Sequence, residues 1–201
     1  MTVVPQPVAM ILEGIVTTVD PAGQMHLAAM GPDVDEAERA AGRITRLRLR
    51  PFATSQTAAN LRRTGCGVFH LSDDVLLLAR TVVGQAGAAP AARPADAVAG
   101  FVLADASQAF EFELHSIDDS AERFEVEANV VATHGGRPFF GFNRAAHAVV
   151  EAAILVTRLH LLEAAEIRRR FAELEPLVAK TGGPRERMAF DLLRGRLDER
   201  P

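Results

Sequence analysis

Residues 50–71 read RPFATSQTAANLRRTGCGVFHL, and this stretch decides how the first half of the chain is interpreted. Thr54 or Ser55 is a favourable N-cap and Gly65 a favourable helix end, so the pattern predicts a short helix between them. Residues 67–71 then predict a strand. The start of this helix collects one arginine and several hydrogen-bonding side chains, namely Arg50, Thr54, Ser55, Gln56, Thr57 and Asn60.

The strand before this helix carries its own signal. In residues 44–50 the leucines alternate with Arg46, Arg48 and Arg50, so the three arginines share one face. Like charges placed so closely repel, and an anion or nearby carboxylates must offset them. The first amides of the following helix are unpaired donors with partial positive charge. Together with the hydroxyl groups, these features predict a phosphate site.

A second interpretation of the same residues stays open. Ser and Thr cap helices in proteins of every kind, and strand arginines often face solvent. The acidic residues 33–38 also offer partners for the arginines. In this interpretation the stretch is structural and binds no ligand.

The rest of the N-terminal part predicts further strands. Residues 10–19 and 25–30 indicate a hairpin with its turn at 20–23, and residues 36–41 indicate a helical turn. Residues 84–97 are rich in Ala, Pro and Gly and predict an exposed loop, followed by a short strand over residues 99–104.

Two long alternating segments come next. In residues 109–117 and 123–132, apolar side chains alternate with polar ones, which is typical of half-solvated antiparallel strands joined by a hairpin at 118–120. The alternation places Phe110 and Phe112 on the buried face and Glu111 and Glu113 on the solvent face.

Helical periodicity begins after these strands. A short helix is predicted over residues 74–83, and longer ones over 145–162, 163–180 and 185–197, with Asn143 as an N-cap. Six or seven strands followed by helices indicate an α+β protein, with an antiparallel sheet closed into a barrel and helices beside it. We divide the chain into residues 1–138 and 139–201.

Composition excludes several classes. The chain has 201 residues with a net charge of −4, so a cationic nucleic-acid footprint is not expected. Its single cysteine excludes a disulfide framework and suits a reducing cytoplasm. The first residues lack the basic segment of a signal peptide, and no apolar run reaches the ~20 residues that span a bilayer. We expect neither nucleic acid nor membrane as a partner.

Other candidate residues have a structural and a functional interpretation. Cys66 with His70 would be needed for thiol chemistry, but a small buried thiol is the commoner case. No histidine spacing matches a metal motif, so no metal site is expected. Residues 139–142 (FFGF) either pack on a ring or plug the core, and Asn143 with Arg144 either meet an anion or only begin a helix. No catalytic residue can be assigned.

The run Arg50-Pro51-Phe52-x-x-Ser55-x-Thr57-x-x-Asn60-Leu61, then Thr64-Gly65, resembles the flavin-reductase-like split β-barrels that bind FMN. The likeness is closer to the family catalogued as domain of unknown function 447, which joins such a barrel to a C-terminal helical part. It extends to MILEGIVTT at residues 10–18, AAMG at residues 28–31 and GFNRxxHAVVEA at residues 141–152. One departure is Ala29, where the family tends to have proline.

The resemblance implies roles for particular residues. Residues 1–138 would form the FMN-binding split barrel and residues 139–201 a helical subdomain. Thr54, Ser55, Gln56 and Thr57 would hold the phosphate of FMN, with Arg50 as countercharge and Asn60 steadying the turn. Residues 28–31, including Ala29, Met30 and Gly31, would offer backbone groups to the flavin ring, and Asn143 and Arg144 are further candidates. A homodimer with FMN at the interface is implied.

Three functions remain in competition at this stage. The first is an FMN-dependent oxidoreductase that passes hydride or electrons between a reduced nicotinamide or deazaflavin and an unknown acceptor. The second is a protein that binds FMN or another phosphorylated ligand without turnover. The third is an interaction protein whose helical tail docks a partner chain.

Overall fold

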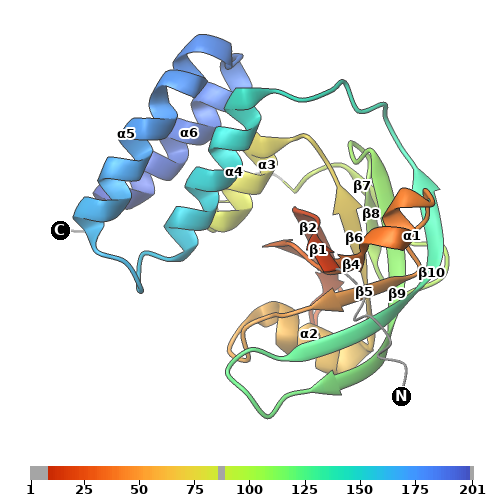
Figure 1. The fold of residues 1–201 in the computed structure, drawn as a ribbon. Coiled ribbons are helices and arrows are strands. Elements are labelled where there is room, and N and C mark those ends of the chain that lie inside the picture. The colour runs from red at the N-terminus through yellow and green to blue at the C-terminus, as the bar shows by residue number, and fades with distance from the viewer. Residues whose placement is uncertain (1–8, 86–88, 200–201) are drawn as a thin grey trace, which may run out of the picture. The chain divides into compact units, whose positions relative to one another are not determined.

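The computed structural model describes residues 9–85 and 89–199. Contacts between residues divide the chain into two compact units. The first unit contains Met1–Leu71 and Ala91–Arg137, and the second contains Ser72–Pro90 and Pro138–Pro201. The helix predicted over residues 74–83 therefore belongs to the second unit. Figure 1 shows the elements of both units.

The first unit is built on an eight-stranded antiparallel sheet that curls into a half-barrel (Figure 1). The α+β fold with an antiparallel split barrel, predicted from the sequence, is confirmed. The sheet order is β1 (Ala9–Ile11), β4 (Asp33–Asp35), β5 (Arg46–Leu49), β10 (Glu125–Gly135), β9 (Gln108–Asp118), β6 (Cys66–Leu71), β2 (Gly14–Val19) and β3 (Met25–Met30).

Apolar and polar side chains alternate along the strands, and the apolar ones form the core of this unit. In β5, Leu47 and Leu49 are buried while Arg46 and Arg48 are exposed, as the sequence predicts. Their partner strand β10 buries Val126 and Ala128 in the same way. Helix α2 (Gln56–Thr64) adds Leu61 to this core, and α1 (Glu36–Ala40) is a single short turn.

Three expectations about this unit are wrong in detail. Residues 10–19 form two strands, β1 and β2, because β1 leaves the hairpin to pair with β4. The predicted loop over residues 84–97 contains strand β7 (Ala92–Pro94), which pairs with β8 (Phe101–Leu103). Glu111 is fully buried and does not face solvent, because the chain after β7 covers that part of β9.

The second unit is helical. It contains α3 (Val75–Val82), α4 (Arg144–Thr157), α5 (Ala164–Thr181) and α6 (Pro184–Asp198). Their apolar faces share one core that includes Leu76, Val149, Phe171 and Phe190. Helix α4 is shorter than the predicted 145–162, because a turn over residues 158–162 ends it. Over the part of the chain that the structure describes, no helix has the length and apolarity to span a membrane.

Two glycines allow a matched test of backbone strain. Gly65 ends α2 with φ of 68°, in the left-handed region, whereas Gly195 lies inside α6. A Cβ atom at either position would meet nothing within 4 Å. Gly65→Ala should therefore lower the free energy of unfolding by about 1 kcal/mol, because alanine resists positive φ.

Gly195→Ala should have the opposite effect and raise it by about 0.5–1 kcal/mol, because alanine favours the helix interior. Urea unfolding followed by circular dichroism measures both. Equal effects of the two substitutions would contradict the strain argument.

Candidate functional site

Helix α2 is the element that positions the predicted site. Ser55 is its N-cap, and the Ser55 Oγ accepts a hydrogen bond from the backbone N–H of Ala58 at 3.1 Å. Gly65 is its C-cap. The helix lies against strands β2, β3 and β6 of the curled sheet. The predicted helix and both of its caps are thus confirmed.

Polar contacts fix α2 to the two strands at the edge of the sheet. Asn60 is fully buried, and its Nδ2 donates to Thr18 Oγ1 on β2 at 2.9 Å. Gln56 Nε2 donates to Asn60 Oδ1 at 2.8 Å. Thr57 is also buried, and its Oγ1 lies 3.2 Å from His26 Nε2 on β3. The side chains of Thr57 and Asn60 therefore face the sheet.

The first turn of α2 keeps unpaired donors. Among the described residues, no acceptor takes the backbone N–H of Gln56 or of Thr57. Thr54 just before the helix is exposed, and Ser55 is half-buried. A helix of nine residues presents these amides with the positive end of its dipole. This arrangement suits an anion such as a phosphate group.

His26 is a residue that the sequence did not single out. It lies on β3 and reaches the first turn of α2 through Thr57. Burial lowers the pKa of His26, while nearby Asp20 acts in the opposite direction. The imidazole is therefore neutral at neutral pH, with one donor and one acceptor nitrogen. An isolated histidine in a strand gives no sequence pattern from which this role follows.

The strand arginines are paired with carboxylates. Arg50 lies 3.6 Å from Asp33 and 3.9 Å from Glu125, measured between side-chain nitrogen and oxygen atoms. Arg48 pairs with Glu127 at 3.4 Å and Arg46 with Glu38 at 3.7 Å. These contacts correspond to the structural interpretation of the arginine row. The role of Arg50 as countercharge to a phosphate stays a prediction.

The three residues predicted beside the flavin ring lie at the end of β3. Within the part of the chain that the structure describes, this strand is at the edge of the sheet and pairs with β2 alone, where Ile15 faces Ala29 and Gly14 faces Met30. Ala29, Met30 and Gly31 are all half-buried. The free edge of β3 leaves backbone N–H and C=O groups available to a ligand.

Asn143 and Arg144 belong to the second unit. Asn143 is the N-cap of α4, and its Oδ1 accepts from the backbone N–H of Ala145 at 2.8 Å and of Ala146 at 3.2 Å. Its Nδ2 donates to the Thr181 carbonyl at 3.2 Å. The capping role predicted for Asn143 is confirmed. Arg144 is exposed in the first turn.

The phenylalanines before α4 are exposed. Phe140 is 83% and Phe142 is 89% accessible, so neither belongs to the core of the helical unit. Phe142 packs its ring against Phe139 and His147, with ring centres 5.8 Å apart in each pair. The core-plug interpretation is therefore wrong for these two side chains.

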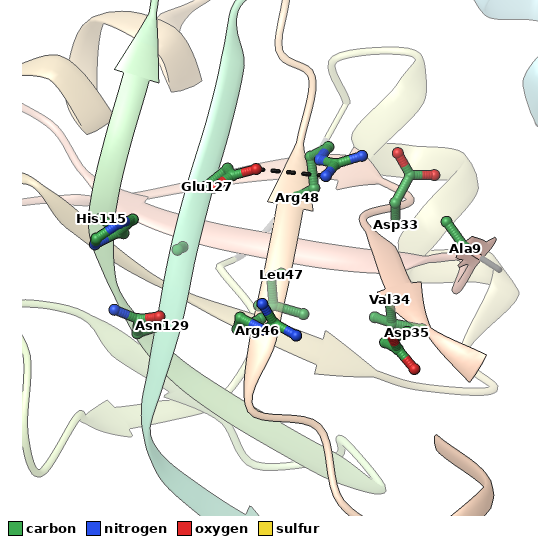
Figure 2. Close-up of a pocket in the computed structure, with 11 residues that line it drawn as sticks. Ala9, Asp33, Val34, Asp35, Arg46, Leu47, Arg48, His115, Glu127 and Asn129 are labelled. Atoms are coloured by element: carbon green, nitrogen blue, oxygen red, sulfur yellow. Dashed lines mark hydrogen bonds and ion pairs between the residues drawn. The ribbon is translucent and has the colours of Figure 1, made fainter. Parts of the chain in front are cut away.

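A cleft of about 400 Å³ opens where β4 and β5 separate (Figure 2). The two strands pair at Asp33 and Arg48. Farther along, Asp35 and Arg46 lie on opposite sides of the gap (Figure 2). Arg48 and Glu127 form an ion pair across its rim. Asp33, Asp35 and Glu127 also line this cleft, and their negative charge makes it a poorer anion site than the first turn of α2.

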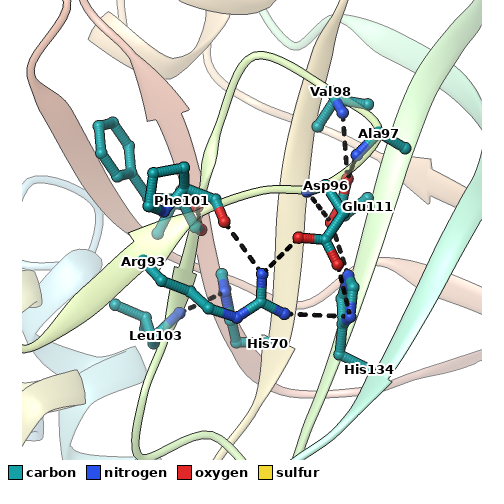
Figure 3. A network of polar contacts seen from close by, with 11 residues as sticks. His70, Arg93, Asp96, Ala97, Val98, Phe101, Leu103, Glu111 and His134 are labelled. Carbon is teal, nitrogen blue, oxygen red and sulfur yellow. Dashed lines mark hydrogen bonds and ion pairs between the residues drawn. The ribbon is translucent and has the colours of Figure 1, made fainter.

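A polar network centred on Glu111 holds the chain that follows β7 (Figure 3). The Glu111 carboxylate accepts from the backbone N–H groups of Asp96, Ala97 and Val98 at 2.8, 2.6 and 3.0 Å, and lies 2.5 Å from His134 Nε2. Burial acts to raise the pKa of Glu111, but these hydrogen bonds outweigh it and keep the pKa below its ordinary value.

The same network brings together side chains that could bind a metal ion, but their ligand atoms are already engaged. Ligand atoms of Asp96, Glu111 and His134 lie within 4.8 Å of one another. Arg93 Nη1 already donates to Asp96 Oδ1 at 2.7 Å, and the Glu111 oxygens are occupied by hydrogen bonds. A cation would have to displace these contacts, so we interpret the network as a structural clamp.

His70 and Cys66 are each engaged separately. The backbone N–H of Leu103 donates to His70 Nε2 at 3.1 Å, which makes Nε2 the acceptor and leaves Nδ1–H to donate to the Ile15 carbonyl at 3.1 Å. The Cys66 thiol is buried and lies 3.6 Å from the Ala99 carbonyl. The structural interpretation of this pair, a small buried thiol, is confirmed.

Comparison with known families agrees with this architecture. Residues 12–136 match the N-terminal domain of the protein of unknown function DUF447, and residues 143–195 match the DUF447 domain described as its C-terminal part. The chain belongs to the DUF447 family. No curated protein matches the chain. The division at residues 138 and 139 stays a prediction.

Solved structures share the fold. An FMN-bound DUF447 protein from Methanosarcina mazei superposes with a TM-score of 0.73 and 22% identity, over 92% of this chain and 94% of that one. A flavoredoxin from Methanosarcina acetivorans gives 0.52 with 8% identity, over 70% and 78%. The flavin reductase HpaC, solved with NADP⁺, gives 0.53 with 10% identity, over 65% and 83%. At these identities the likeness establishes the fold.

The buried His70 makes stability depend on pH. Burial lowers the pKa of His70 to about 4, against an ordinary value of 6.5. Below pH 6.5, His70 binds a proton in the unfolded chain but stays neutral in the folded chain. The free energy of unfolding therefore falls as the pH is lowered. We expect a loss of about 2 kcal/mol between pH 7 and pH 5 from this residue.

Chemical denaturation at pH 7, 6 and 5 measures this dependence. The His70→Asn variant is the control: it is less stable at every pH, but its stability should change less between pH 7 and pH 5. An identical slope in the variant would show that His70 is not the buried group responsible.

Proposed function

We propose that this protein binds FMN in its first unit, with the phosphate at the first turn of α2. The observation that carries the proposal is the pair of amides of Gln56 and Thr57, which have no acceptor among the described residues and follow directly after the exposed Thr54 and the N-cap Ser55. Membership of the DUF447 family supports it, because a solved member from Methanosarcina mazei contains FMN.

The residues present fit the chemistry of FMN. A phosphate dianion needs several donors, and two amides with the Thr54 hydroxyl offer three. Ser55 holds the turn in place by capping the helix. The flavin ring needs a flat edge with hydrogen-bonding groups, which the outer side of β3 at Ala29, Met30 and Gly31 offers. We include Arg50, Asn143 and Arg144 as further candidates from the resemblance.

The redox function that we propose rests on bound FMN. Bound FMN supplies hydride and electron transfer, and the protein positions and shields its ring. We propose an oxidoreductase that takes electrons from a reduced nicotinamide or deazaflavin, with an acceptor that the residues do not specify. Fold similarity to flavin reductases supports this class. A homodimer with FMN at the interface and a location in the cytoplasm stay predictions.

Titration with FMN and with riboflavin tests the binding site. Riboflavin has the same ring and no phosphate, so comparing the two ligands separates the contribution of the phosphate contacts from that of the ring contacts. We expect quenching of FMN fluorescence on binding and a clearly weaker affinity for riboflavin. Thr54→Val should lower the affinity for FMN about 10-fold, because it removes one hydrogen bond to a charged group. The affinity for riboflavin should not change.

Two results would contradict the proposal. The first is wild-type protein that ignores FMN in both fluorescence and calorimetry. The second is equal affinity for FMN and riboflavin, which would show that the phosphate makes no contact that contributes to binding. Reduction of bound FMN by NADH or NADPH then separates an oxidoreductase from a protein that binds flavin without turnover.

A further inference from the structure

His26 is the side chain that we consider for contact with the phosphate, a step that rests on the proposed function. His26 projects from β3 toward the first turn of α2, where its Nε2 lies 3.2 Å from Thr57 Oγ1. The ring is half-buried, so it remains reachable from solvent. It therefore approaches the same turn whose amides are unpaired.

Four arginines near α2 are engaged in other contacts. Arg123 lies over the Phe52 ring and donates to the Arg50 carbonyl at 3.4 Å. Arg50 pairs with Asp33 and Glu125. On α2 itself, Arg62 pairs with Asp119 at 2.5 Å and Arg63 donates to the Val19 carbonyl. Both of these arginines lie in the last turn of the helix, at the end opposite the unpaired amides. These contacts hold each of the four guanidinium groups away from a direct role at the first turn.

The contact of His26 with Thr57 is exchangeable. It joins a neutral imidazole to a neutral hydroxyl, a bond that contributes about 0.5–1.5 kcal/mol. A phosphate oxygen is a charged acceptor, and hydrogen bonds to charged groups contribute about 1.5–3 kcal/mol. A phosphate at this turn would therefore compete for the Nε2–H of His26, with the tautomer that carries a proton on Nε2 selected by binding. The Thr57 hydroxyl that this releases can instead donate to a carbonyl of the preceding turn, as threonines in helices do.

We propose that His26 is a phosphate-binding residue of the FMN site, donating from Nε2 to the phosphate beside the first turn of α2. In this arrangement the phosphate is held from two elements, the amides of α2 on one side and the edge strand β3 on the other. The flavin ring and its phosphate then contact the same strand, because Ala29 and Met30 follow His26 along β3 and Gly31 comes directly after it.

The experiment compares FMN with riboflavin in four proteins: wild type, His26→Leu, His26→Gln and Arg50→Met. His26→Leu should weaken FMN about 10-fold, the loss of one charge-assisted hydrogen bond, and change riboflavin less than about 2-fold. His26→Gln should restore most of the FMN affinity, because the glutamine amide places a donor near the position of Nε2. Arg50→Met should lower the affinity for FMN less than His26→Leu does, because Asp33 and Glu125 already hold the Arg50 guanidinium.

Other outcomes overturn the inference. If His26→Leu lowers the affinities for FMN and for riboflavin equally, His26 has only a structural role at the first turn of α2. If it changes neither while Arg50→Met lowers FMN affinity alone, Arg50 is the phosphate residue. Wild-type protein that binds neither ligand overturns the proposed function itself, and the inference with it.

A spectroscopic measurement on the wild type covers the case in which His26→Leu fails to fold. In protein labelled with ¹⁵N-histidine, the His26 imidazole resonances are identified by their absence in His26→Gln. FMN should shift the Nε2 resonance of His26, and riboflavin should not. No shift with saturating FMN would rule out contact with the phosphate.

Discussion

The fit between α2 and the edge of the sheet is the constraint on which the rest of the structure depends. Asn60 and Thr18 are both fully buried, and the bond between them ties the helix to β2. Buried polar atoms tolerate little displacement, because an unpaired one is costly. The first turn of α2 is thereby fixed beside β3, with its amides directed away from any partner within the described residues.

The sequence alone predicts the helix and strand that form the site, because the signals that mark them are local. Ser55 and Gly65 mark the ends of α2, and the alternation of Leu47 and Leu49 marks the buried face of β5. Such signals depend on neighbouring residues only. The family resemblance adds the split barrel and the helical part, and the fold and the family matches agree with both.

Long-range contacts are what the sequence could not supply. Glu111 alternates like a solvent-facing residue, yet the chain after β7 covers it and donates three backbone hydrogen bonds. His26 carries no motif, and only the placement of β3 against α2 brings it to the predicted site. Arg50 has the right chemistry for a phosphate, but strand pairing places Asp33 and Glu125 beside it.

The most direct measurement is the response of the α2 backbone amides to FMN in a ¹H–¹⁵N correlation spectrum. If the phosphate sits on the first turn, the resonances of Gln56 and Thr57 shift strongly with FMN and much less with riboflavin. The account is contradicted if FMN binds and leaves these two resonances in place, or if the largest phosphate-dependent shifts fall on residues of the β4–β5 cleft instead.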